Sequence, residues 1–404
     1  MRSLLDLPPE LVLQILLHTV PWNRPLEPLD VLPFSLVHSS LTRLAQSLAW
    51  CSLTLTSEAH IRRVLSSPVA GTYAAEIRSL RFLPRKEEDD GTDGGFGTIL
   101  GAGQGIEGAL VESFLKWLSR ETDGAERGLR VVDVASVKPL RVELLEGDLL
   151  ADLKDLTLGT GLAFPTSRLP PSSFAFPFHL ASLTLHNNHW ESLPPSFLSA
   201  LLSQTCTNLR HLDLSATYDV AHFGPFLSIT SPSPDPASIP LPILATLHTL
   251  RLPPLESLPH FTFATTALSL TRSLRYLELP LLSAPSDPAL DEFWTALAGL
   301  RGSLLEVGVR GYACRALYQT AAKVVETLCP PEATTRPTGR LRRVRLVGVK
   351  AEQLLKGIGS SDFEWVVGVA DFERVVGVAR RRGVEVVCGA FDERWLCGKE
   401  EWRG

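Results

Sequence analysis

Two histidines three residues apart, His186 and His189, are the residues whose type and spacing first suggest chemistry. A third, His211, belongs to the next predicted strand, and imidazole nitrogens are common ligands of zinc. A zinc site needs three or four ligands that converge on one point. Because His186 and His189 lie where a predicted strand ends, we expect their side chains to diverge. We therefore predict neither a metal site nor a bound cofactor.

A glycine pattern, Gly103-x-Gly105-x-x-Gly108, formally matches the fingerprint that holds the phosphates of a dinucleotide. That fingerprint requires a strand directly before it, inside a β-α-β unit. The residues upstream are acidic or glycine, which is typical of a loop, and we interpret residues 84–106 as an insertion. No serine, histidine or cysteine has the setting of a catalytic nucleophile. We predict no catalytic residues, and hence no enzyme.

Charge and cysteine content argue against several further classes of protein. A net charge of −5 over 404 residues predicts no binding to nucleic acid or to an anionic membrane. The six cysteines contain no C-x-x-C pair and do not suggest a disulfide framework. No uninterrupted apolar run reaches the roughly 18 residues of a membrane span. These features favour a protein of the cytoplasm, the nucleus or both.

A short pattern, apolar-x-x-apolar-x-apolar, recurs nine times and predicts the elements that would position functional side chains. Successive copies are mostly about 30 residues apart, which is a period of repeat proteins. Each copy predicts a strand whose alternate residues point inward. The central apolar residues of the nine copies are Leu80, Val132, Leu156, Leu183, Leu212, Leu250, Leu277, Val307 and Val344.

The segments between the copies carry apolar residues at helical spacing, as at 109–118, 197–202 and 293–300. A single strand-helix unit cannot bury its own apolar face, whereas stacked units share a continuous core. The pattern and its period resemble leucine-rich repeats. The resemblance implies an α/β solenoid over residues 56–404, with strands on the concave face and helices outside.

Two segments of this region stand out from the repeat. Residues 228–242 are rich in proline and serine, and we interpret them as a solvated loop between repeats. Residues 362–379 consist of DFEWVVGVA followed by DFERVVGVA, a local duplication to which the sequence assigns no role.

Residues 1–55 do not follow the repeat. The segment LPPELVLQIL at 7–16 predicts the start of a helix, since proline fits the first turn and Glu10 lies near its positive end. A second helical stripe follows, and AWCSLTL at 49–55 predicts the first strand of the array. These segments, with VHSSLTRLA at 37–45, resemble the F-box, a small all-α module.

F-box proteins with leucine-rich repeats are substrate receptors of Skp–cullin–F-box ubiquitin ligases. The resemblance implies that the helical module docks on a Skp-family adaptor, and through it on a cullin-RING ligase, while the repeats hold a protein target. Two alternatives stay open: residues 4–55 only cap the array, or the chain is a repeat scaffold unrelated to ubiquitin. The predicted adaptor-binding residues are Leu7, Pro8, Leu11, Ile15, Leu16, Val37 and Leu41.

Strand geometry predicts where a target would bind. Residues between the apolar positions point away from the core, and from His186 onward they become charged and aromatic, as binding anchors are. Basic character grows toward the last copy, so we expect a target with acidic or phosphorylated groups. The predicted target-binding residues are His186, His211, Asp213, Arg251, Tyr276, Glu278, Glu306, Arg310, Arg343 and Arg345.

Overall fold

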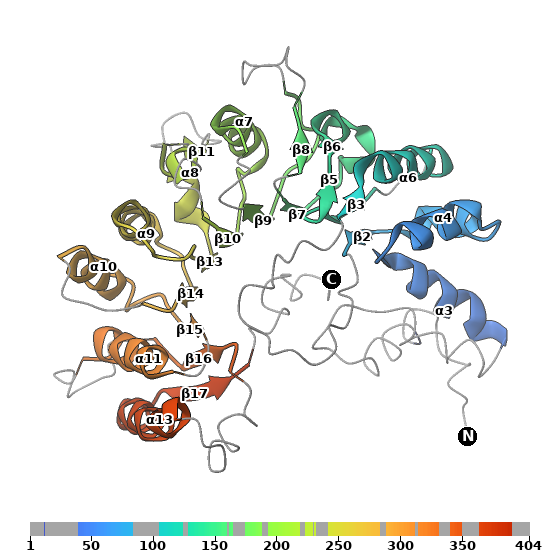
Figure 1. Cartoon of the computed structure of the whole chain (residues 1–404). Helices are drawn as coiled ribbons and strands as arrows, with labels where there is room; N and C mark the ends of the chain where they lie inside the picture. The colour runs from blue at the N-terminus through green and yellow to red at the C-terminus, as the bar shows by residue number, and fades with distance from the viewer. Residues whose placement is uncertain are drawn as a thin grey trace. The chain divides into compact units, whose positions relative to one another are not determined.

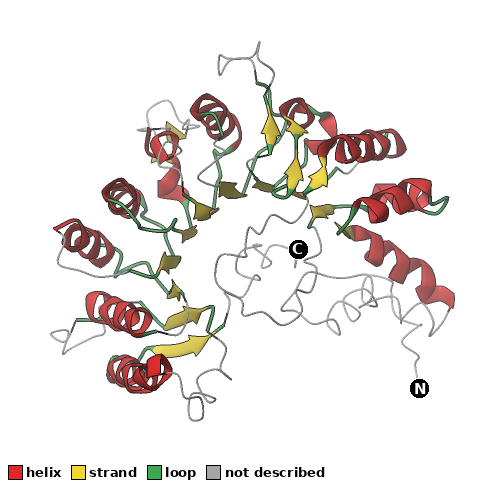
Figure 2. Cartoon of the chain, viewed as in Figure 1, coloured by secondary structure: helices red, strands yellow, loops and turns green. Residues whose placement is uncertain are grey.

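Helices and strands alternate along the chain in the computed structural model (Figure 2). The chain divides into two compact units, which we call unit 1 (Met1–Leu180) and unit 2 (Ala181–Gly404). The structure describes residues 12, 39–83, 105–123, 128–159, 161–164, 174–187, 193–218, 223–228, 230–231, 241–282, 288–311, 314–330, 340–349 and 363–389.

The main sheet is parallel, and its strand order follows the chain. Within the described residues it has eleven strands, in the order β1-β2-β4-β7-β9-β10-β13-β14-β15-β16-β17. Parallel neighbours need a crossover between them, and helices supply most of these crossovers. The α/β class predicted from the sequence is confirmed.

Unit 1 contains four strands of the main sheet and two short additional sheets, in which β3 pairs with β5 and β6 with β8. Its described elements are α3 (Ser39–Cys51), β1 (Ser52–Leu55), α4 (Glu58–Ser66), α5 (Ala70–Tyr73), η2 (Ala74–Glu76), β2 (Ser79–Phe82), β3 (Ile106–Glu107), α6 (Gly108–Glu121), β4 (Val131–Asp133), β5 (Val137–Lys138), β6 (Leu140–Arg141), η4 (Val142–Glu146), η5 (Asp148–Leu150), β7 (Asp155–Leu158) and β8 (Leu162–Ala163).

Unit 2 contains the other seven strands of the main sheet, and its helices lie on one side of them (Figure 1). Its described elements are β9 (Ser182–Asn187), α7 (Pro195–Thr205), β10 (His211–Thr217), α8 (Phe223–Ser228), β11 (Thr230–Ser231), β12 (Leu241–Pro242), η8 (Ile243–Thr246), β13 (Thr249–Arg251), α9 (Leu258–Leu270), β14 (Tyr276–Pro280), α10 (Pro288–Ala298), β15 (Glu306–Arg310), α11 (Arg315–Leu328), β16 (Arg343–Val347), α13 (Phe363–Arg381) and β17 (Glu385–Cys388).

The predicted motif copies set the register of the sheet. All nine central residues lie in strands and are at most 2% exposed. They face one another across neighbouring strands, so that Leu212 pairs with Leu250, and Leu250 with Leu277. The helices predicted at 109–118 and 197–202 are α6 and α7, and the one at 293–300 is α10, which ends at Ala298. Strand positions and most of the intervening helices are thus confirmed.

The junction between the N-terminal segment and the sheet differs in detail from the prediction. The strand expected at 49–55 begins only at Ser52, because the preceding residues complete α3. Trp50 of α3 stacks on Tyr73, and the Tyr73 hydroxyl donates a hydrogen bond to Gln46. These contacts fix α3 against α5.

The glycine pattern at 103–108 has a packing role at its last residue. A side chain at Gly108 would place its Cβ 1.5 Å from the carbonyl oxygen of Pro139, so only glycine allows this approach of α6 to β6. Ile106, at the end of the predicted insertion, instead belongs to β3, where it is buried and pairs with Val137. The short strand β3 falls inside the glycine pattern rather than before it, unlike a dinucleotide fingerprint.

The nine-residue duplication extends one helix. Both copies fall within α13 from Phe363 onward. Nine residues make two and a half helical turns, so equivalent residues of the two copies lie on opposite sides of the helix. In the second copy, Val375, Val378 and Ala379 are buried, which gives this copy the role of packing α13 onto unit 2.

Candidate protein-interaction surface

Side chains on the strand face opposite the helices form two polar rows in unit 2. Because strand residues alternate between faces, these rows flank the buried row of Leu212, Leu250 and Leu277. We call this face the inner surface; it comprises Arg310, which lies one row further along β15, and the residues of the two rows, His211, Asp213, Thr249, Arg251, Tyr276, Glu278, Glu306, Arg343, Arg345 and Glu385.

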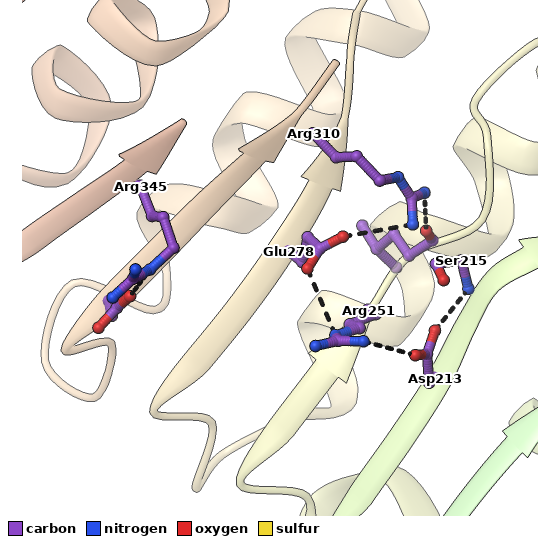
Figure 3. Close-up of polar contacts among 8 residues, drawn as sticks. Asp213, Ser215, Arg251, Glu278, Arg310 and Arg345 are labelled. Carbon is purple, nitrogen blue, oxygen red and sulfur yellow. Dashed lines mark hydrogen bonds and ion pairs between the residues drawn. The ribbon is translucent and has the colours of Figure 1, made fainter. Parts of the chain in front are cut away.

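Four side chains of the inner surface form a continuous chain of ion pairs, the Asp213 cluster (Figure 3). Arg251 Nη1 lies 2.9 Å from Asp213 Oδ2, and Arg251 Nε lies 3.3 Å from Glu278 Oε2. The other oxygen of Glu278 lies 3.3 Å from Nη1 of Arg310. Arg310 also donates a 3.3 Å hydrogen bond to the carbonyl oxygen of Leu252. The cluster thus joins β10, β13, β14 and β15.

A second chain of ion pairs, the Glu306 cluster, joins β15, β16 and β17. Arg345 Nε donates a 2.6 Å hydrogen bond to Glu306 Oε1, and Arg343 Nη1 lies 3.5 Å from Glu306 Oε2. Arg343 Nε in turn donates a 2.9 Å bond to Glu385. Glu385 was not among the predicted binding residues.

The centres of both clusters are shielded from water. The side chains of Glu278 and Glu306 are only 5% exposed, whereas that of Glu385 is 59% exposed. Burial raises the pKa of Glu278 above its usual value, although Arg251 and Arg310 act to lower it. For Asp213 burial also acts to raise the pKa, but the charge of Arg251 and the hydrogen bonds that Asp213 accepts outweigh it, and the pKa is lowered.

The charges of the two clusters cancel. Four arginines are matched by four carboxylates, which differs from the growing basic character expected from the sequence. The arginines Arg343 and Arg345 share Glu306, so the end of unit 2 does not offer two unopposed cations. An acidic or phosphorylated target would therefore have to compete with carboxylates that already hold these guanidinium groups.

The predicted histidines do not come together. His211 pairs in register with Ser182, whereas His186 lies opposite Ala216 at the other end of β9, and His189 lies outside the described residues. His211 is 9% exposed, and burial, with help from His248 and Arg210, lowers its pKa to about 4. In the part of the chain that the structure describes, no three His, Cys, Asp or Glu side chains are grouped to hold a metal ion.

The remaining predicted residues divide into two sets. Tyr276 lies on the inner surface between Thr249 and Glu306 in register and is 9% exposed. Of the adaptor-binding residues, Leu41 falls in α3. The others lie outside the described residues, and they are Leu7, Pro8, Leu11, Ile15, Leu16 and Val37.

The proline- and serine-rich loop is described only at its ends. There β11 pairs with β12 in antiparallel fashion, Thr230 opposite Pro242 and Ser231 opposite Leu241. Residues 232–240 lie outside the described residues. The loop therefore begins and ends as a short hairpin beside α8 and η8.

None of the described helices has the length and apolar character that a bilayer span requires. A comparison of the sequence with protein-family models finds no match, and a comparison with curated proteins finds none either.

Proposed function

We propose that this chain is a non-catalytic substrate receptor of a ubiquitin ligase. Its N-terminal segment, residues 1–55, docks on a Skp-family adaptor, and a leucine-rich-repeat solenoid over residues 56–404 holds a protein target for ubiquitination. The observation that carries this proposal is the in-register ladder of motif copies, which aligns charged side chains of successive strands into one surface.

The register of the strands supports the repeat architecture. In unit 2 each motif copy supplies one strand, and a helix or helical turn follows before the next copy. The motif's apolar residues face the helices and are buried, as Leu277 and Leu279 are in β14. This is the arrangement expected when each unit buries its apolar face only against its neighbours.

The inner surface supports a role in binding protein. Arginine and tyrosine are enriched among the residues that dominate protein–protein affinity. Ion pairs within the two clusters already hold the side chains of Arg251, Arg310 and Arg345 in place. Side chains that are ordered before binding lose less conformational entropy when a partner arrives, which favours affinity and specificity.

Adaptor docking rests on the resemblance of residues 7–16, 37–45 and 48–55 to the F-box. What the structure adds is that α3, near the end of this segment, packs against α5 through Trp50 and Tyr73. A docking module that is joined to the repeats by a packed helix would hold the repeats in a fixed orientation relative to the adaptor.

Recovery of the adaptor and cullin with the tagged full-length chain tests the proposal. We expect both to co-purify with the wild-type chain and to be lost when Leu7 and Pro8 are replaced by Ala. Leu258→Ala is a matched control, because Leu258 is an apolar side chain of unit 2 that is 63% exposed. Undiminished recovery by a folded Leu7→Ala/Pro8→Ala variant would refute the docking role, and no recovery with wild type would favour a scaffold unrelated to ubiquitin.

A further inference from the structure

An open groove of about 950 Å³ lies between α9 and α10, on the helical side of unit 2. The C-terminal half of α9 and residues of α10 from its first turn onward line it, together with the turns that follow both helices. Its residues come from elements other than the strands of the inner surface, and the proposed function gives it no role.

Four of the hydroxyl groups along this groove donate hydrogen bonds to backbone carbonyl oxygens. Ser269 donates a 2.9 Å hydrogen bond to the carbonyl oxygen of Thr265, and Thr295 donates a 2.8 Å bond to that of Asp291. Thr271 and Ser303 likewise donate to backbone oxygens of the preceding helical turn. A hydroxyl that has donated its proton offers a ligand only oxygen lone pairs. These four hydroxyls therefore face a ligand in the groove only as hydrogen-bond acceptors.

The charges along the groove favour a cation. Asp291 and Glu292 are exposed on α10, and among the described residues neither forms an ion pair. Arg272, which follows the C-terminal end of α9, is the cationic side chain among the lining residues. Two carboxylates and one guanidinium among the lining side chains leave the groove with a net negative charge.

The floor of the groove is apolar. Leu268 and Leu300 line it and are 1% and 5% exposed, and Ala296 leaves room above them. A lysine side chain combines a four-carbon stem, which can cover such a floor, with an ammonium group of three donors. No other charged side chain pairs a flexible aliphatic stem with a compact group that only donates hydrogen bonds.

We propose that this groove binds a lysine-bearing extended segment of a partner protein. The lysine stem lies over Leu268 and Leu300, and the ammonium group is held by the carboxylates of Asp291 and Glu292 and the hydroxyl oxygen of Thr295. Arg272, at the other end of the groove, repels a second cation and so favours one direction of the bound segment.

Fluorescence anisotropy with a fluorescein-labelled peptide of alternating lysine and serine tests the proposal on the full chain at about 0.15 M salt. Asp291→Asn/Glu292→Gln should weaken binding at least tenfold, the change expected for about 1.4 kcal/mol. Ala296→Phe, which fills the groove without changing charge, should weaken binding to a similar extent. A matched peptide of alternating glutamate and serine should not bind.

The control removes the same two charges elsewhere. Glu326 on α11 and Glu373 on α13 are exposed carboxylates of unit 2 outside the groove, and Glu326→Gln/Glu373→Gln should change affinity less than twofold. If both double variants weakened binding equally, the binding would be a general attraction between a basic peptide and an acidic protein, and the proposal would be overturned. Absence of binding by the wild-type chain would overturn it as well.

Discussion

Asp155 of unit 1 and Asp213 of unit 2 are both half-buried carboxylates of the main sheet, in the third and fifth copies of the motif. Burial raises the pKa of Asp155 to about 6, and the charge of Arg81 lowers it only in part. For Asp213 the same effect of burial is outweighed, because Arg251 lies 2.9 Å away and the amide of Ser215 donates a 2.9 Å hydrogen bond. The contact with Arg251 and the hydrogen bond from Ser215 thus set the direction of the pKa shift at Asp213. On the inner surface of unit 2 the arginines and carboxylates of the two clusters contact one another directly.

The two units also differ in how they should respond to acid. His211 of unit 2 has its pKa lowered to about 4, so the folded state binds fewer protons than the unfolded state at mildly acidic pH. Asp155 has its pKa raised, so there the folded state binds more protons. Lowering the pH should therefore reduce the free energy of unfolding through His211 of unit 2 and increase it through Asp155 of unit 1.

The largest expected effect comes from breaking the Asp213 cluster at its centre. Glu278→Ala would leave Arg251 and Arg310 largely buried without their shared carboxylate. Removing one partner of a buried ion pair typically costs about 3–5 kcal/mol. Urea denaturation at pH 7 should show this loss in the free energy of unfolding. A loss below about 1 kcal/mol would mean that the cluster is not a stabilising unit.

A smaller effect is expected at His211. Since its folded pKa lies below the usual 6.5, its contribution to stability is complete above pH 6.5 and is lost as pH falls toward 4. Between pH 7 and pH 5 this amounts to about 2 kcal/mol. In His211→Phe the free energy of unfolding should fall less over this range than in wild type. An unchanged pH dependence would show that His211 is not the titrating group.

The opposite sign is expected at Asp155. Because its folded pKa is about 6, above the usual 3.8, ionisation costs stability as pH rises through this interval. Between pH 5 and pH 7 the cost is about 1 kcal/mol. Asp155→Asn should therefore stabilise the chain more at pH 7 than at pH 5, measured by thermal unfolding. Equal stabilisation at both pH values would contradict the raised pKa.

The smallest effect is expected at the exposed end of the Glu306 cluster. The side chain of Glu385 is 59% exposed and contacts Arg343, which is 36% exposed. Such pairs contribute about 0.2–1 kcal/mol because water and salt screen them. Glu385→Ala should lower the free energy of unfolding by no more than this at 0.15 M salt. A loss as large as that of Glu278→Ala would show that solvent exposure does not govern how much these ion pairs contribute to stability.

The strand positions and the columns of the inner surface could be predicted from the sequence. Aligning the motif copies at Leu212 and Leu250 places Asp213 beside Arg251, and the structure shows the same register. The diagonal contacts could not be predicted. Glu306 and Arg345 belong to different rows, and their contact depends on how two long side chains extend past Gly308.

The last strand, β17, is not among the strands predicted from the motif, and the reason is local. In register, Val386 of β17 matches the motif centre Val344, which puts Gly383 where other copies carry their leading apolar residue. Gly383 has a φ of +68°, a left-handed conformation that glycine adopts without strain, and it ends the turn after α13. The turn requires glycine where the motif has an apolar residue, so the motif does not extend to β17 although the strand does.

The central claim is that the inner surface of unit 2 captures the target, and proximity labelling of cellular proteins tests it most directly. Arg343→Gln/Glu385→Gln removes the exposed Arg343–Glu385 pair and the 3.5 Å contact of Arg343 with Glu306. Glu306 keeps Arg345 at 2.6 Å and the net charge is unchanged, so we expect the fold to be preserved. Glu58→Gln/Arg62→Gln removes a comparably exposed pair from α4 of unit 1. Loss of a specific set of labelled proteins only in the first variant is the predicted result. An unchanged set in that variant, with folding intact, would contradict the claim.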